Sequence, residues 1–301
     1  MINQNKLIIM IIIIIFVTPV TKPDSKNIPT HIQTIKTFLH HFCVTIDSVG
    51  EVFRSQLNLL IITKIQTSKI IGKNVVVFVH GRNGKFVHFK QTIENIAYLN
   101  KIVNDELIDD QWDVLKGSMV DFQNMIIKLK DGNNYAMRIV SLGNNAYTSL
   151  DEDADTLEQE ISQYLDCNIT LIGLSKGGVV SMRYATTKND HRIKKVITIS
   201  SPLKGTLIAS LFPTNSVVNT NLGYMNQISQ DIEHDVNNKK NIPKIYHIVP
   251  KWDHMIIPVD SAMYNSTPDC QILYYNQTTY GHFNIQNSME VAATLSNWLI
   301  Q

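Results

Sequence analysis

The sequence predicts an α/β protein in which helices cover both faces of a mostly parallel, doubly wound sheet. Short apolar runs rich in Val and Ile alternate with longer stretches of helical periodicity from residue 74 to the C-terminus. The clearest of these runs is continuously apolar rather than alternating, which is typical of a parallel strand buried on both faces. Another leads through a glycine-rich turn directly into a helical pattern. We therefore expect strand and helix to follow each other along the domain.

The individual elements follow from local patterns. The clearest strand is 74–79, Asn-Val-Val-Val-Phe-Val, which ends abruptly at a turn containing Gly81 and Gly84. A helix over 151–165 opens with acidic residues, which the positive end of the helix dipole favours. Further strands are expected at 135–142, 168–173, 193–200, 244–249 and 271–275, and further helices at 86–110, 119–129, 177–187 and 285–300.

The length of 301 residues suits one large α/β domain, expected over 72–301. A helical extension over 30–71 precedes it, and 1–29 form a leader with its linker. The segment 206–242 interrupts the rhythm of strands and helices with Pro213, many Asn residues and scattered apolar groups. We expect this segment to be an inserted lid.

The leader contains an unbroken apolar run from Leu7 to Val17, preceded by Lys6. The run is shorter than the roughly 20 residues that a membrane-spanning helix needs, and polar residues follow it. It predicts either a signal peptide or a retained membrane anchor, so the protein is expected to be secreted or anchored to a membrane. A buried core helix is the third reading of the run.

Charge and cysteine usage narrow the range of functions. The formal net charge is only +1 and no basic run stands out, so nucleic acid is not an expected partner. The three cysteines, Cys43, Cys167 and Cys270, lie in no C-x-x-C or Cys/His pattern. The sequence therefore predicts neither a metal site nor a cofactor.

The strongest chemical motif is Gly-Leu-Ser-Lys-Gly-Gly at 173–178, a G-x-S-x-G match centred on Ser175. It stands between a predicted strand and a predicted helix, where a sharp turn holds the serine hydroxyl out for attack. Its glycines keep side chains out of a crowded turn. A phosphate-binding loop is excluded, because Lys176 lacks the glycine and Ser/Thr neighbours of that motif. Ser175 is the predicted nucleophile.

A serine hydroxyl needs a base to take its proton and an acid to orient that base. His282 follows the last predicted strand and precedes the terminal helix, so it is the predicted base. Asp253 follows the strand 244–249 and is the predicted acid, which gives the chain order Ser, Asp, His. His254 and Asp260 are the nearest rivals for these two roles.

The negative charge that develops on the substrate oxygen needs preorganised N–H donors. These are expected from the residue after the nucleophile and from the loop after an earlier strand, which gives the backbone amides of Lys176 and Arg82. His80, at the start of that loop, is expected to shape the loop rather than act as a second base.

With these motifs in order, the chain from about residue 73 to its end resembles the α/β-hydrolase superfamily. The segment 196–206, Val-Ile-Thr-Ile-Ser-Ser-Pro-Leu-Lys-Gly-Thr, looks like the corresponding segment of lipases and GPI inositol-deacylase-like proteins. The usual lipase turn carries His or Tyr before the serine and Gln, Met or Leu after it, whereas here the residues are Leu174 and Lys176. The resemblance implies a serine esterase acting on lipid-like substrates, whose acyl chain the lid would meet.

Two other functions remain open on the sequence. The same residues would serve a thioesterase, amidase or peptidase, because all these reactions pass through similar tetrahedral states. A hydrolase fold used as a binding protein, without turnover, is the second alternative, since a fold alone does not establish an activity.

Overall fold

The computed structural model of the protein describes residues 73–82, 84, 86–104, 125–142, 148–211, 221–239, 242–264, 270–277 and 280–301. The predicted leader at 1–29 and the helical extension at 30–71 lie outside these ranges, so both remain predictions. Within these ranges no helix has the length and apolar character needed to cross a membrane.

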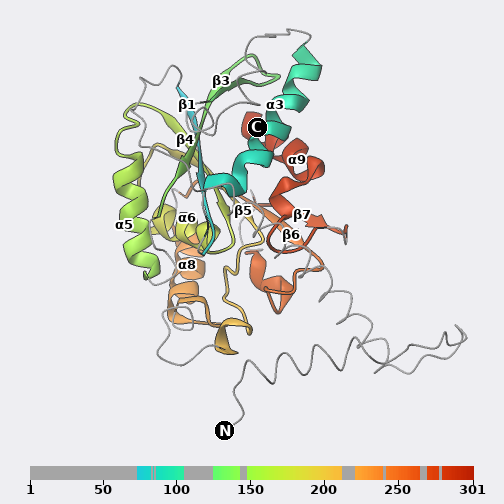
Figure 1. The fold of residues 1–301 in the computed structure, drawn as a ribbon. Coiled ribbons are helices and arrows are strands. Elements are labelled where there is room, and N and C mark those ends of the chain that lie inside the picture. Colours follow the sequence, from blue (N-terminus) through green and yellow to red (C-terminus); the bar gives the residue numbers. More distant parts are fainter. Residues whose placement is uncertain are drawn as a thin grey trace, which may run out of the picture. The chain divides into compact units, whose positions relative to one another are not determined.

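A seven-stranded sheet forms the centre of the described domain (Figure 1). Its strands lie in the order β2-β3-β1-β4-β5-β6-β7, and all neighbouring pairs are parallel except β2 with β3. The strands are β1 (Asn74–Val79), β2 (Ile126–Lys128), β3 (Asn134–Val140), β4 (Asn168–Leu174), β5 (Ile193–Ile199), β6 (Lys244–Pro250) and β7 (Gln271–Tyr275). The predicted α/β class with a mostly parallel sheet is confirmed.

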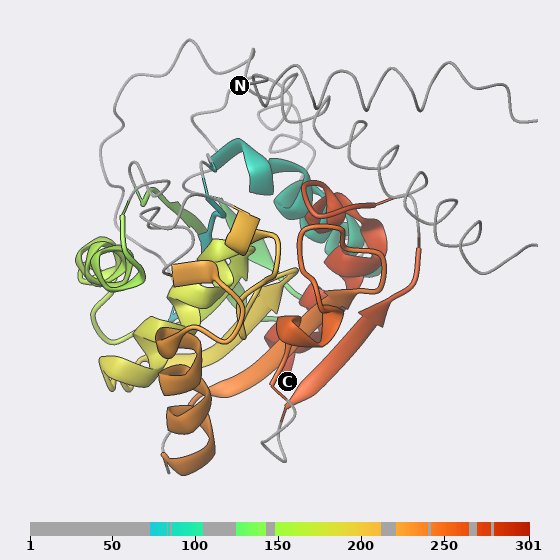
Figure 2. The same cartoon turned by 90° about the horizontal axis from the view of Figure 1, so that it is seen from below.

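Helices cover both faces of the sheet, as Figures 1 and 2 show from two directions. One hydrophobic core lies between the sheet and α5, α6 and α8, and the other between the sheet, α3 and α9. These helices are α3 (Lys90–Asn104), α5 (Leu150–Ile161), α6 (Lys176–Thr187), α8 (Gln227–Asn238) and α9 (Met289–Ile300), and short 3-10 turns are η1 (Phe86–Phe89), η3 (Ala209–Leu211), η4 (Val259–Ala262) and η5 (Ile285–Asn287).

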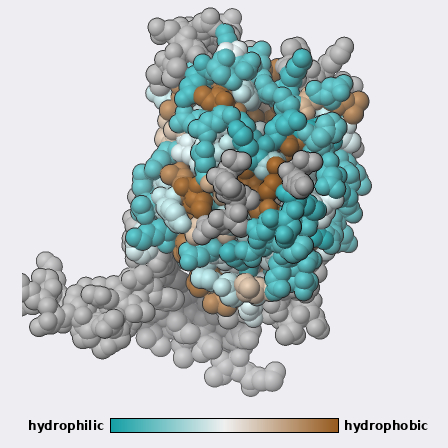
Figure 3. All heavy atoms as spheres, turned by 180° about the vertical axis from the view of Figure 1, so that it is seen from behind, coloured by the Kyte–Doolittle hydropathy of each residue, from teal (hydrophilic) through white to brown (hydrophobic). Residues whose placement is uncertain are grey.

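Strand β1 shows why its sequence is apolar throughout. Val75, Val77 and Val79 belong to the core beneath α5, α6 and α8, whereas Val76 and Phe78 belong to the core beneath α3 and α9. Successive side chains of a strand point to opposite faces, so a strand covered on both sides needs apolar residues at every position. On the face of the molecule in Figure 3, hydrophilic residues predominate and hydrophobic ones appear in small areas between them.

The helix predicted over 119–129 is wrong in its described part. Residues 126–128 form β2, which pairs antiparallel with β3. The turn at Gly132, whose φ is +80°, closes a hairpin in which Leu129 N donates to Asn133 O. Cross-strand pairing therefore outweighs the local helical pattern, as tertiary context often does for short apolar runs.

The segment 206–242 contains η3 and α8 in its described part. Helix α8 buries Ile232 and Val236 and packs against α6. Asn226 caps its first turn by accepting a hydrogen bond from Ser229 N. The lid assigned to this segment remains a prediction, and residues 212–220 and 240–241 within it lie outside the described ranges.

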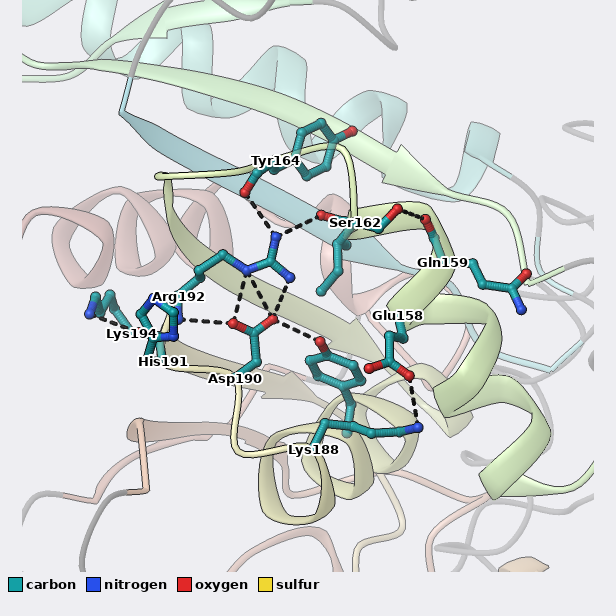
Figure 4. A network of polar contacts seen from close by, with 11 residues as sticks. Glu158, Gln159, Ser162, Tyr164, Lys188, Asp190, His191, Arg192 and Lys194 are labelled. Atoms are coloured by element: carbon teal, nitrogen blue, oxygen red, sulfur yellow. Dashed lines mark hydrogen bonds and ion pairs between the residues drawn. The ribbon is translucent and has the colours of Figure 1, made fainter.

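The amino end of β5 is fastened to its neighbours by Arg192 (Figure 4). Its guanidinium binds both carboxylate oxygens of Asp190 and donates to the carbonyl oxygens of Ile161 and Tyr164 at 3.2 and 3.0 Å. Tyr184, on α6, also donates to Asp190 at 2.8 Å. Burial alone would raise the pKa of Asp190, but the bonds from Arg192 and Tyr184 lower it from 3.8 to about 2.

The variant Arg192→Met is expected to lower the free energy of unfolding at pH 7 by about 2 kcal/mol, because the Asp190 carboxylate loses the cation that stabilises its ionised form in the folded state. A carboxyl whose pKa is depressed on folding stabilises the fold above its unfolded pKa, and this stabilisation is lost as the pH falls through its folded pKa. The difference in the free energy of unfolding between variant and wild type should therefore become smaller as the pH falls from 4 to 2. Urea unfolding across this range measures it.

The matched control is Lys188→Gln. Lys188 forms ion pairs with Asp155 and Glu158, whose side chains are 61% and 49% exposed. Exposed pairs contribute little to stability, so this variant should unfold like the wild type. Equal stability losses in the two variants, or a loss in Arg192→Met that does not depend on pH, would contradict the role given to Asp190.

Candidate active site

The predicted site residues meet at the carboxyl edge of the sheet. Ser175 follows β4 and Asp253 follows β6, while His282 lies between β7 and α9. Parallel strands end at a common edge, and in open α/β sheets this is the edge where ligands bind. Topology alone therefore brings together residues that are far apart in the sequence.

Ser175 occupies a strained turn between β4 and α6. Its φ and ψ are 53° and −125°, a combination that a residue with a side chain rarely adopts. The turn is held by Ser175 N donating to Ile199 O at 2.9 Å and by Gly178 N donating to Ser175 O at 3.0 Å. Within 169–182 every residue other than Ser175 is buried, so the serine alone reaches toward solvent.

Two glycines after the serine are required by close backbone packing. A Cβ on Gly177 would lie 2.1 Å from the carbonyl oxygen of Val79, and one on Gly178 would lie 2.0 Å from Ser201 Oγ. Both distances are far below contact distance, so α6 could not approach β1 and β5 with larger residues here. The motif glycines are thus needed to place the helix under the serine.

Ser175, His282 and Asp253 form a continuous hydrogen-bonded chain. His282 Nε2 lies 2.8 Å from Ser175 Oγ, and His282 Nδ1 lies 2.8 Å from Asp253 Oδ2. His282 and Asp253 are each 5% exposed. Nδ1 carries a proton toward the carboxylate, which leaves the Nε2 lone pair facing the serine hydroxyl.

The Asp253 carboxylate is held by donors on both oxygens. Oδ1 accepts from the backbone N–H groups of Met255 and Ile256 at 2.8 and 3.1 Å, and Oδ2 accepts from Ser200 Oγ and His282 Nδ1. Burial would raise the pKa of Asp253, but His282 and these hydrogen bonds lower it below its ordinary value. The carboxylate therefore stays ionised in a buried position.

The rival residues do not take these positions. Asp260 is exposed in η4, whereas Asp253 is buried beside His282. The ring of His254 lies 6.1 Å from that of Phe283, and it is His282 that contacts Ser175.

The loop after β1 runs directly beside the serine. A Cβ on Gly81 would lie 3.0 Å from Ser175 Cβ and 3.6 Å from Ser175 Oγ. His80 is buried, which lowers its pKa and keeps it neutral. Its Nε2 accepts from Leu142 N at 3.2 Å, so Nδ1 carries the proton and donates to Gly81 O at 2.9 Å. His80 thus ties this loop to the segment after β3, which is a shaping role.

The side chain of Lys176 is buried, and its ammonium group forms an ion pair inside the protein. Its ammonium lies 2.7 Å from Asp153 Oδ2 and donates to Thr148 O at 2.8 Å, and the side chains of Lys176 and Asp153 are 3% and 1% exposed. Burial lowers the pKa of Lys176, and the bond to Asp153 opposes this effect. The lysine that follows Ser175 thus joins the first turn of α6 to that of α5.

Sequence reasoning missed Ser200 and Asp153. Ser200 contacts both Asp253 and His282, and its place as the last residue of the strand predicted over 193–200, at the same edge as Ser175, is the only signal that points to it. Asp153 is one of three acids in the first turn of α5, and nothing in the sequence separates it from its neighbours. Among the described residues no cluster of three or more His, Cys, Asp or Glu could hold a metal ion.

No protein-family model and no curated protein sequence matches the chain. Among solved structures it is similar to the esterase domain of a Rhodothermus marinus protein, at 14% identity over 75% of this chain and 86% of that chain, with a TM-score of 0.48. A monoacylglycerol lipase of Paleococcus ferrophilus shows 15% identity over 76% and 96%, with a TM-score of 0.48. A Bacillus licheniformis lipase shows 17% identity over 78% and 96%, with a TM-score of 0.47.

Similarities this low carry no argument about function. The chain's own strand order and its strained serine turn at the carboxyl end of β4 give it the α/β-hydrolase fold.

The variant Lys176→Met is expected to lower the free energy of unfolding by about 3 to 5 kcal/mol, because it leaves the Asp153 carboxylate buried without its partner. Urea unfolding at pH 7 measures the loss.

The matched variant Lys176→Met/Asp153→Leu removes both charges at once and should recover most of the lost stability, since apolar replacements of buried ion pairs are often neutral. If the single and double variants are equally unstable, the ion pair does not account for the loss.

Proposed function

We propose that the protein is a serine hydrolase that cleaves carboxylic esters, with Ser175 as nucleophile, His282 as general base and Asp253 as the orienting acid. The observation that carries this proposal is the contact chain from Ser175 Oγ through both ring nitrogens of His282 to the buried carboxylate of Asp253, with 2.8 Å at each step. A strained, partly exposed serine at the end of this chain suits nucleophilic attack better than a structural role.

The reaction proceeds in two halves. Ser175 Oγ attacks the ester carbonyl carbon while its proton passes to His282 Nε2, and the resulting imidazolium is stabilised by Asp253. Collapse of the tetrahedral intermediate releases the alcohol, which takes the proton from His282, and leaves an acyl group on Ser175. Water, activated by the same histidine, then attacks the acyl-enzyme and restores the serine.

The backbone amides of Lys176 and Arg82 are the proposed donors to the tetrahedral oxyanion. Lys176 directly follows Ser175 and is the first residue of α6, where the positive end of the helix dipole lies. Arg82 follows Gly81, whose Cα region packs against Ser175. Donors on both flanks of the nucleophile would stabilise the charge as it develops.

A lipid-like ester is the proposed substrate. Four apolar side chains with 40–49% exposure lie on the segments that follow β5 and β6, and we call them the apolar rim: Leu207, Tyr224, Met225 and Ile257. Leu207 N donates to Ile257 O at 2.8 Å, which joins the two segments. Ile257 directly follows Ile256, whose N–H binds Asp253, and exposed apolar side chains on such segments could supply surface for an acyl chain.

Two finer assignments are also proposals. Membership of the lipase and GPI inositol-deacylase-like branch rests on the segment 196–206. Export or membrane anchoring rests on the apolar run in the leader, with the two outcomes still open.

The variant Ser175→Ala is expected to lower kcat for p-nitrophenyl esters roughly 10⁶-fold, because no other group replaces the nucleophile. Thermal unfolding of the variant provides the folding control. Activity retained by folded Ser175→Ala would overturn the proposal. Activity that is present in the wild type and lost in the folded variant would exclude a binding protein without turnover.

With wild-type protein, kcat/KM should rise with acyl length from acetate to octanoate, since each added methylene can bury apolar surface on the apolar rim. The p-nitrophenyl ester series measures this rise. A maximum at acetate would reject the lipid-like substrate but not the hydrolase. Matched thioesters and amides of the preferred acyl group would then show whether an ester is the favoured substrate.

A further inference from the structure

Ser200 is a buried serine at the carboxyl end of β5, one strand away from Ser175. It is fully buried and has a φ of +49°, a left-handed backbone that a residue with a side chain adopts only when its surroundings require it. Its N–H donates to Ile248 O on β6 at 2.9 Å. This backbone bond joins β5 to β6, the strand that precedes Asp253.

The Ser200 hydroxyl contacts both members of the acid–base pair. Oγ donates to Asp253 Oδ2 and lies 3.1 Å from His282 Nδ1. A hydroxyl has one proton and two lone pairs, so once its proton is given to Oδ2 it can accept from the Nδ1 proton. The proton on His282 Nδ1 therefore lies between two acceptors, Asp253 Oδ2 and Ser200 Oγ.

We propose that Ser200 is a positioning residue that fixes the Asp253 carboxylate and holds the His282 ring with its Nε2 lone pair toward Ser175. This inference rests on the proposed function, because it assigns a role within the same site. Ser200 itself touches no reacting atom and acts only through its two partners.

The neighbouring serine provides a contrast within the same turn of chain. Ser201 is also buried, but its Oγ bonds to the carbonyl oxygens of Ile199 and Gly173 and packs against Gly178. Its hydroxyl therefore supports backbone near the nucleophile without a bond to Asp253 or His282. Of these two adjacent buried serines, Ser200 therefore contacts the acid–base pair, whereas Ser201 supports only backbone.

The test compares Ser200→Ala with Ser201→Ala by steady-state kinetics on a p-nitrophenyl ester. Loss of a hydrogen bond to a charged group is expected to lower kcat about tenfold in Ser200→Ala, with KM within twofold of the wild type. Ser201→Ala should keep kcat within twofold. If Ser200→Ala also keeps kcat, or if both variants lose it equally, the positioning role is wrong.

A second background separates positioning from a general structural effect. In His282→Ala there is no imidazole to orient, so adding Ser200→Ala should change the residual rate less than twofold. A tenfold loss in this background as well would show that Ser200 supports the fold instead. Ser200→Gly, which suits the left-handed backbone, removes the same hydroxyl and gives the same test if Ser200→Ala does not fold.

The NMR signal of the His282 Nδ1 proton gives a readout independent of turnover. It is expected far downfield in the wild type and clearly displaced in Ser200→Ala, because the hydroxyl that contacts both Nδ1 and Asp253 Oδ2 is lost. An unchanged signal would contradict the inference. Loss of activity in Ser175→Ala together with wild-type behaviour of Ser200→Ala would overturn this inference alone, whereas activity retained in Ser175→Ala would overturn the proposed function too.

Discussion

The turn that places Ser175 between β4 and α6 is the constraint on which the site depends. The serine has a positive φ, and backbone hydrogen bonds on both sides hold the turn in place. In addition, α6 packs so closely against β1 that only a glycine fits at position 177. A side chain at Gly177 or Gly178 would push the helix away from the sheet and release the strain. The hydroxyl is thereby held outward from a stretch that is otherwise buried, so the cost of the strained backbone is met by packing elsewhere.

Buried charge is arranged on two sides of this turn. On one side, four donors surround the Asp253 carboxylate, and one of them is the imidazole that contacts the serine. On the other side, Lys176 and Asp153 neutralise each other beneath the first turn of α6. Unpaired charges would be costly in both places, so each fixes the position of the element that carries it. Both arrangements limit how far the serine turn can move relative to the sheet.

Much of the fold, and the three residues Ser175, Asp253 and His282 that the structure brings together, could be predicted from the sequence. The strands around Ser175 are continuous apolar runs, and the order of serine, aspartate and histidine along the chain matches the carboxyl ends at which the structure brings them together. The β2 strand could not be predicted, because it is short and its pairing with β3 depends on the turn at Gly132. The roles of Ser200 and Asp153 could not be predicted, because they depend on contacts with residues about 50 and 20 positions away in the sequence. No local sequence pattern indicates such contacts.

Mapping the covalent adduct that a fluorophosphonate ester forms with the purified wild-type protein tests directly whether Ser175 is the nucleophile. Such reagents phosphonylate a serine whose hydroxyl is activated by a neighbouring base, and peptide mass spectrometry locates the modified residue. We expect one adduct, on Ser175, with Ser200 and Ser201 unmodified because both are buried. An adduct on another serine, or none on the folded protein, would contradict the assignment of Ser175 as the nucleophile.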